Sequence, residues 1–221
     1  MATIESYVTP QRLYRYRSLK EYERELEAIE QSYVFCSAYE DLNDPMEGLF
    51  TSSRLLRKSA NHRAIRDAVV DRKSQIGLCS FSEVYDNGLM WAHYADQFRG
   101  ICIAYRLSHL LECLPQDINL VRMYYNEMVP TIRQGHWTPK QLAKMVLSYK
   151  NYRWLYEREW RMFARQGCAS YRKTNCISCV YLGARINPND RSRITGALKR
   201  LRIKTMEMEI DEYFISFRSC T

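Results

Sequence analysis

Short segments typical of β-strands recur along the whole chain, and helix signals lie between them in no regular order. Residues 13–17, 76–81 and 100–107 combine alternating or continuous apolar character with aromatic and β-branched side chains. A parallel α/β protein would alternate strands and helices in a repeating βαβ order, and this chain does not. The sequence therefore predicts an α+β fold. We expect a single domain over residues 1–221, with a mainly antiparallel mixed sheet flanked by helices.

The remaining elements follow from periodicity and from capping residues. Further strands are expected at 33–37, 120–125, 159–164, 179–182, 203–208 and 213–217. One helix is expected to begin at Ser18 with a capping box to Glu21, and another at Thr138, with a box to Gln141, that runs to about Tyr152. Other helical segments are expected at 53–73, 90–96 and 188–201.

The chain is basic. Its 221 residues carry a formal net charge of +8, and 46% of them are hydrophobic, which is ordinary for a globular protein. This charge favours anionic partners such as nucleic acid, nucleotide phosphates or an acidic surface. A solvated basic surface explains the same charge equally well. Cations gather late in the chain, at Arg185, Arg191, Arg193, Lys199, Arg200, Arg202 and Lys204.

The cysteines and the apolar runs bear on the compartment. The chain has eight cysteines at irregular spacing, no hydrophobic signal segment at its start, and no apolar run of the roughly 20 residues that span a bilayer. We therefore expect reduced thiols, a cytoplasmic location and no membrane partner. Cys176 and Cys179 form one CxxC with Cys168 upstream, but zinc sites use four ligands, so no metal is predicted.

The segment Glu157-Arg158-Glu159-Trp160-Arg161 is the most informative for chemistry. As a strand it places Glu157, Glu159 and Arg161 on one face. Two carboxylates so close together repel each other, and crowding or burial shifts their pKa values, which suits a general base or the stabilisation of a cationic centre. As a helix it pairs Glu157 with Arg161 on the surface. A catalytic glutamate and a structural ion-pair network both remain open.

Arginines in the first strand are candidates to complement these acids. Arg15 and Arg17 share one face of the expected strand at 13–17. Guanidinium groups bind phosphates and carboxylates through two parallel hydrogen bonds. The pair therefore suits the pyrophosphate of a dinucleotide, and it equally suits neutralisation of Glu157 and Glu159.

Two further segments bring polar and aromatic groups together. Asn43 and Asp44 precede Pro45 in a stiff turn, where they suit either ligand binding or plain turn chemistry. Residues 90–95 include Trp91, His93 and Tyr94. His93 is a candidate acid or base and also a candidate structural histidine. Trp91 suits a hydrophobic core as well as a stacking platform.

Several well-known catalytic motifs are absent from the sequence. It contains no GxGxxG, GxxxxGK[ST], HExxH or GxSxG pattern. Rossmann oxidoreductases, P-loop NTPases, zincins and α/β-hydrolases are therefore disfavoured.

Five motifs in a fixed order carry a family resemblance. They are LYRYR at 13–17, NDPME at 43–47, LCSFS at 78–82, MWAHYA at 90–95 and WLYEREWR at 154–161. This order resembles a widespread bacterial domain family of unknown function, over roughly residues 13–183.

The chain also resembles, more weakly, the ADP-ribosyltransferase superfamily. Members carry an Arg or His after an aromatic residue on an early strand, as Tyr14 and Arg15 do, Ser or Tyr groups on a middle strand, and a catalytic Glu on a late strand. The resemblance implies NAD as cofactor, with Glu157, Glu159 and His93 as catalytic candidates. Its implied cofactor-binding residues are Arg15, Arg17, Tyr94, Asn43, Asp44, Trp91 and Arg161.

Three functions are compatible with these patterns. The first is an NAD-consuming ADP-ribosyltransferase, acting as a toxin or in phage defence on nucleic acid or protein, with an antitoxin or immunity partner. The second is a nucleic-acid hydrolase that holds Mg²⁺ through Asp44, Glu47, Glu157 and Glu159. The third is a non-enzymatic module that binds nucleic acid or protein, in which the Glu and Arg side chains form a buried structural network.

Overall fold

The computed structural model describes residues 9–172 and 174–220, so the first residues of the chain, where the sequence shows no signal segment, lie outside the described residues. These residues form two compact units. Unit 1 comprises the described residues within Met1–Leu26, Glu83–Cys113 and Lys173–Thr221. Unit 2 comprises Glu27–Ser82 and Leu114–Arg172. The single domain expected over residues 1–221 stays a prediction.

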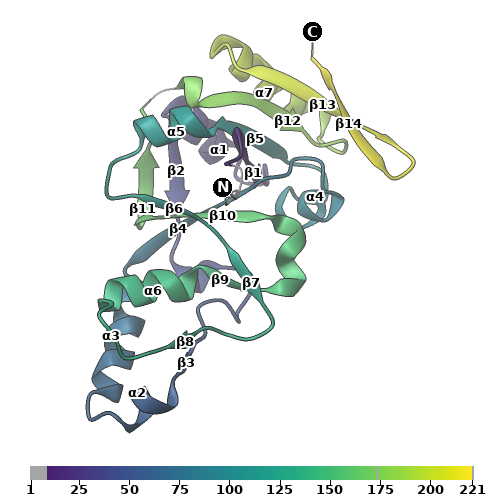
Figure 1. Ribbon diagram of the computed structural model, residues 1–221. Helices are drawn as coiled ribbons and strands as arrows, with labels where there is room; N and C mark the ends of the chain where they lie inside the picture. The colour runs from purple at the N-terminus through teal and green to yellow at the C-terminus, as the bar shows by residue number, and fades with distance from the viewer. Residues whose placement is uncertain (1–8, 173, 221) are drawn as a thin grey trace, which may run out of the picture. The chain divides into compact units, whose positions relative to one another are not determined.

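Unit 1 contains five strands in the order β14-β13-β12-β5-β1 among its described residues (Figure 1). All neighbouring pairs are antiparallel except β12 and β13, which are parallel. Such a pair needs a crossover connection, which α7 (Pro188–Arg200) provides. The strands are β1 (Arg12–Arg17), β5 (Ile101–Arg106), β12 (Ile177–Leu182), β13 (Lys204–Asp211) and β14 (Phe214–Ser219).

Short helices complete unit 1. They are α4 (Gly88–Tyr94), α5 (Leu107–Cys113) and the 3₁₀ turn η3 (Thr174–Cys176). Trp91 of α4 is fully buried, and its ring lies 5.3 Å from that of Tyr16 in an edge-on arrangement. The strand β5 is buried along nearly its whole length, so it forms the centre of this core. Helix α1 (Tyr22–Glu30) contains the point where the chain passes from unit 1 to unit 2.

Unit 2 is built on three antiparallel strands in the order β4-β10-β6. They are β4 (Ile76–Ser82), β10 (Glu159–Arg165) and β6 (Asn119–Arg122). Three two-stranded pairs accompany them. An antiparallel pair joins β2 (Tyr33–Cys36) to β11 (Gly167–Ser170), and parallel pairs join β3 (Thr51–Ser52) to β8 (Thr131–Ile132) and β7 (Tyr124–Asn126) to β9 (Tyr149–Asn151).

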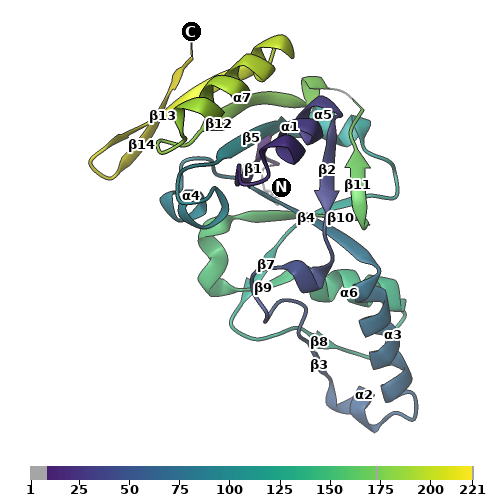
Figure 2. The same ribbon diagram turned by 180° about the vertical axis from the view of Figure 1, so that it is seen from behind.

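Helices α3 (His62–Ser74) and α6 (Pro139–Leu147) lie side by side in unit 2, as Figure 2 shows from behind. Their apolar side chains share one core with β4 and β10, which includes Val69, Leu78, Val146 and Phe163. The unit also contains α2 (Arg54–Lys58) and the 3₁₀ turns η1 (Tyr39–Asp41) and η2 (Tyr152–Glu157).

These elements confirm the α+β class with a mainly antiparallel mixed sheet and flanking helices. Most expected strands are found within a few residues of their predicted bounds. In the described part of the chain, no helix is both long and apolar enough to cross a membrane.

Two predicted helices were wrong in extent. The helix expected at 53–73 is two helices, because Ser59 is extended and its hydroxyl accepts a hydrogen bond from the Asn61 N–H. Serine and asparagine compete with helical hydrogen bonding in this way. The helix that begins after Thr138 does have the predicted capping box, but it ends at Leu147, since residues Tyr149–Asn151 pair with β7 instead.

Two other boundaries also differ. The helix expected at Ser18 begins at Tyr22, because the Ser18 hydroxyl accepts from the Lys20 N–H in a local turn. The strand expected at 120–125 divides into β6 and β7 at Met123. The two parts pair with different partners, β10 and β9, which single-sequence periodicity does not reveal.

Candidate functional site

Five charged side chains form a buried group in unit 2, which we call the ionic cluster: Glu47, Lys150, Glu157, Glu159 and Arg161. Arg161 is 0% exposed, and Glu47, the most exposed of the five, is 7% exposed. Removing charges from water is costly unless each finds opposite charges and hydrogen bonds. The contacts within the cluster therefore decide what it can do.

Lys150 lies among three carboxylates. Its Nζ donates to Glu157 Oε2 at short distance and to Glu159 Oε2 at 2.9 Å, and it lies 3.3 Å from Glu47 Oε1. The ammonium has three N–H donors, which matches three carboxylate neighbours. Burial lowers the pKa of Lys150, but Glu159, Glu47 and Glu157 outweigh it and raise the pKa well above its ordinary value. Lys150 is therefore charged at neutral pH.

Arg161 joins the same carboxylates to the backbone of α6. Its Nε donates to Glu159 Oε1 at 2.8 Å, and its Nη2 lies 2.5 Å from Glu47 Oε2. Its Nη1 donates to the carbonyl of Leu147, the last residue of α6, at 2.9 Å. The guanidinium thus binds two carboxylates and also satisfies one of the carbonyls that a helix end leaves unpaired.

Glu159 is held ionised by these two cations. Burial raises the pKa of its carboxyl, but Arg161 and Lys150 outweigh this and lower the pKa to about 2. Its backbone N–H donates to the hydroxyl of Tyr125 at 2.7 Å. Burial in turn raises the pKa of Tyr125 above its ordinary value.

Local backbone geometry explains how neighbouring residues reach one cluster. Glu159 and Arg161 alternate along β10 and so share a face, as the sequence predicts. Glu157 instead ends the 3₁₀ turn η2, so the expectation that it continues this strand was wrong. Arg158 between them adopts a left-handed conformation, with φ of 45°. This reversal brings both glutamates to Lys150, which β9 supplies.

Through these contacts the ionic cluster links β9, β10 and η2 to the end of α6. Three carboxylates face two cations, and every cation contact described above is to a carboxylate or to the end of α6. Arg161 holds the C-terminal end of α6 through its hydrogen bond to Leu147. Lys150, which directly follows Tyr149 in β9, ties that strand to the carboxylates. Both elements also line an open pocket.

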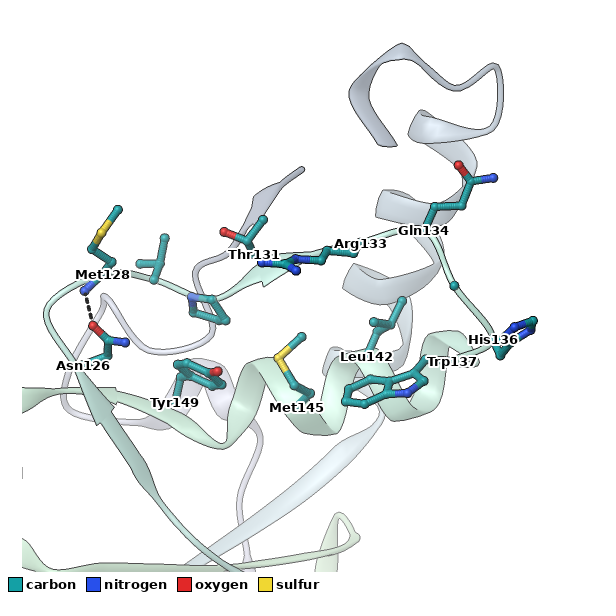
Figure 3. A pocket seen from close by; sticks show the side chains of 13 residues that line it. Asn126, Met128, Thr131, Arg133, Gln134, His136, Trp137, Leu142, Met145 and Tyr149 are labelled. Atoms are coloured by element: carbon teal, nitrogen blue, oxygen red, sulfur yellow. Dashed lines mark hydrogen bonds between the residues drawn. The ribbon is translucent and has the colours of Figure 1, made fainter. Parts of the chain in front are cut away.

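That pocket, which we call the Trp137 pocket, has a volume of about 600 Å³. Trp137, Leu142, Met145 and Tyr149 line it along and beside α6, and Figure 3 shows Arg133 on the facing segment. Trp137 is 57% exposed although it is the largest apolar side chain of the pocket. The volume falls within the range of about 300–1,000 Å³ found for small-ligand sites.

A smaller cavity of about 130 Å³ is lined both by residues of the ionic cluster and by residues of the Trp137 pocket. Its lining includes Asp44, Glu47 and Lys150, and it shares Asn126 and Tyr149 with the Trp137 pocket. The side-chain amide of Asn126 accepts a hydrogen bond from the Met128 N–H, which orders this edge (Figure 3).

The remaining unit 2 candidates differ in exposure. Asp44 is buried, and its carboxylate accepts from the indole N–H of Trp154 at 2.9 Å and from the Met46 N–H at 2.9 Å. Asn43 is exposed on the same turn. Asp44 thus has a turn-forming role as well as lining the small cavity.

The other predicted site residues lie in unit 1. Arg17 donates through Nε to Glu25 Oε2 at 2.7 Å, while Arg15 is half-buried on the same strand. His93 is exposed and Tyr94 is half-buried, with their ring centroids 6.3 Å apart. Trp91 is a core residue, and its indole N–H donates to the carbonyl of Tyr85.

Two important residues were missed from the sequence. Lys150 lies at the end of an expected helix, where a lysine is ordinary, and nothing local marks it as buried. Trp137 carried a weak signal, because it directly precedes the helix cap Thr138 and so lies outside the apolar face of the helix that follows.

The cysteines form no metal centre in the described residues, where no group of three or more His, Cys, Asp or Glu is placed to hold a metal ion. All eight cysteines are free thiols. Cys176 and Cys179 are buried and Cys168 is exposed.

Comparison with known proteins gives one match. Residues 90–162 match the model of a family described as protein of unknown function, DUF2971. Over this segment, which is shorter than the predicted range of 13–183, the chain thus resembles a family of unknown function, as expected. The matched segment includes MWAHYA at 90–95 and WLYEREWR at 154–161, and it contains α6, the Trp137 pocket residues and four members of the ionic cluster. No curated protein and no solved structure matches the chain.

Proposed function

We propose that the protein is a module that binds single-stranded nucleic acid, with an unstacked base held in the Trp137 pocket. The observation that carries this proposal is the exposed indole of Trp137 at the mouth of a pocket of about 600 Å³. An exposed aromatic ring that lines a pocket together with apolar side chains offers a surface on which a planar ligand can stack. Bases stack on such rings in many single-strand-binding proteins.

The rest of the pocket suits a base and its phosphate. Leu142, Met145 and Tyr149 supply an apolar floor for a ring, while Arg133 and His136 supply polar groups at the rim. The net charge of +8 favours approach of a polyanion. The ionic cluster supports this function indirectly, because it fixes α6 and β9, from which Met145 and Tyr149 project.

NAD-consuming ADP-ribosyl transfer, together with a role as toxin or in phage defence, stays a prediction. One feature fits it, since Ser82 of β4 lies opposite Glu159 of β10. A catalytic glutamate must reach its substrate, however, and Glu157 and Glu159 are 3% and 2% exposed and bound to Lys150. The burial of both glutamates leads us to favour binding over catalysis.

The Trp137→Leu variant tests the proposal. Fluorescence anisotropy with a labelled oligothymidylate of about twelve nucleotides should show binding by the wild type, weakened about tenfold in the variant, since one base stacked on an aromatic ring contributes about 1–3 kcal/mol. Tyr213→Leu is the matched control, because Tyr213 is fully exposed and lies outside the pocket. Equal affinities of all three proteins, or no binding by the wild type, would overturn the proposal.

A further inference from the structure

Unit 2 has another pocket, of about 480 Å³, which we call the basic pocket. Arg54 and Arg57 of α2 and His62 and Arg66 of α3 line it. The three arginines are exposed to solvent. None of the residues that line this pocket, all within the described part of the chain, is an aspartate or a glutamate. The pocket therefore concentrates positive charge without a built-in counter-charge.

Hydroxyl groups complete the lining. Ser52 is buried, and its Oγ lies 3.0 Å from Nε2 of His62. The hydroxyls of Thr51 and Thr131 lie 2.9 Å apart across the parallel pair of β3 and β8. Guanidinium forks and hydroxyl donors together are the groups that most often contact phosphate oxygens. This chemistry favours a phosphate-bearing ligand over a cationic or apolar one.

The basic pocket and the Trp137 pocket share one residue. Thr131 lines both, and Figure 3 shows it on the same segment as Arg133 and Gln134. Residues from Thr131 to Trp137 thus run from one pocket to the other within seven positions. A ligand with a base at one end and phosphates at the other would contact both.

We propose that the basic pocket binds phosphate groups of the same nucleic-acid strand whose base occupies the Trp137 pocket. This inference rests on the proposed function for the class of ligand. It adds a separate site, with Arg57 and Arg66 as the residues that contact the strand's backbone.

The test measures affinity for the labelled oligothymidylate at several salt concentrations. Each of Arg57→Gln and Arg66→Gln should weaken binding about threefold and reduce the slope of log affinity against log salt by about 0.7, the amount expected for one phosphate contact to a single strand. Trp137→Leu should weaken binding with an unchanged slope. The control is Arg63→Gln, because Arg63 lies on the same helix, outside the pocket, and is 94% exposed.

The outcomes separate this inference from the proposed function. If Arg57→Gln and Arg66→Gln match Arg63→Gln while Trp137→Leu binds weakly, the basic pocket is refuted and the base pocket stands. If only the arginine variants bind weakly, the base pocket is refuted, and with it the assignment of one strand to both pockets. A competition experiment adds inorganic pyrophosphate to the complexes of the wild type and of Trp137→Leu. If micromolar pyrophosphate displaces the oligonucleotide from both proteins at the same concentration, a free anion is the ligand, and the shared-strand assignment is overturned. Absence of any binding would overturn both.

Discussion

Replacement of Glu159 by glutamine tests the structural role of the ionic cluster. The substitution keeps the size of the side chain and removes one negative charge that contacts both Lys150 and Arg161. In the folded protein the pKa of Glu159 falls from its ordinary value of 4.5 to about 2. Because one pKa unit corresponds to 1.36 kcal/mol, this difference amounts to about 3 kcal/mol of stability at neutral pH. The loss of one partner from a buried ion pair typically costs about 3–5 kcal/mol, which agrees.

Urea unfolding at pH 7, followed by circular dichroism, measures this loss. Glu159→Gln should lower the free energy of unfolding by about 3 kcal/mol. The slope of this free energy against urea concentration should not change. Glu30→Gln is the control, since Glu30 is exposed in α1 and should change stability by less than about 0.5 kcal/mol. A loss below about 1 kcal/mol for Glu159→Gln would refute the view that this carboxylate is a structural partner of two buried cations.

Two further predictions concern pH and close backbone packing. The stability that Glu159 contributes is complete above its ordinary pKa of 4.5 and is lost as the pH falls toward about 2. The unfolding free energy of the wild type should therefore decrease more steeply over this range than that of Glu159→Gln. Parallel pH profiles of the two proteins, measured by chemical denaturation, would contradict this prediction. Gly100→Ala should destabilise the protein by about 1–3 kcal/mol, because an added Cβ would lie 2.1 Å from the carbonyl oxygen of Arg17. Gly196→Ala, in α7 with open space around its Cβ position, should be neutral or slightly stabilising; the midpoints of thermal unfolding of both variants and the wild type measure these effects.

Much of the fold was predictable because local signals decide it. The alternating and apolar segments at 13–17, 76–81 and 100–107 are β1, β4 and β5 within one or two residues. Thr138, Pro139 and Gln141 marked the start of α6 correctly, since caps act through bonds within one turn. The ends of helices were less predictable. At Leu147, the last residue of α6, the carbonyl accepts from the distant Arg161 guanidinium, and the residues that follow pair with β7 instead of continuing the helix.

The candidate site was only partly predictable for the same reason. Glu159 and Arg161 share a face because of strand geometry, which the sequence carries. The third carboxylate, Glu47, is more than 100 residues away from Glu159 and Arg161 in the sequence, and the central cation, Lys150, is about 10 residues away. Only the folded chain brings these side chains together. The left-handed Arg158 that redirects Glu157 has no sequence signature comparable to glycine.

The most direct test of the account follows the indole N–H signals of the four tryptophans by NMR while oligothymidylate is added. Trp137→Leu identifies the signal of Trp137 by its absence. We expect the Trp137 signal to shift progressively to saturation, whereas that of Trp91, buried in unit 1, stays in place. A Trp137 signal that does not move at saturating oligonucleotide would contradict the account.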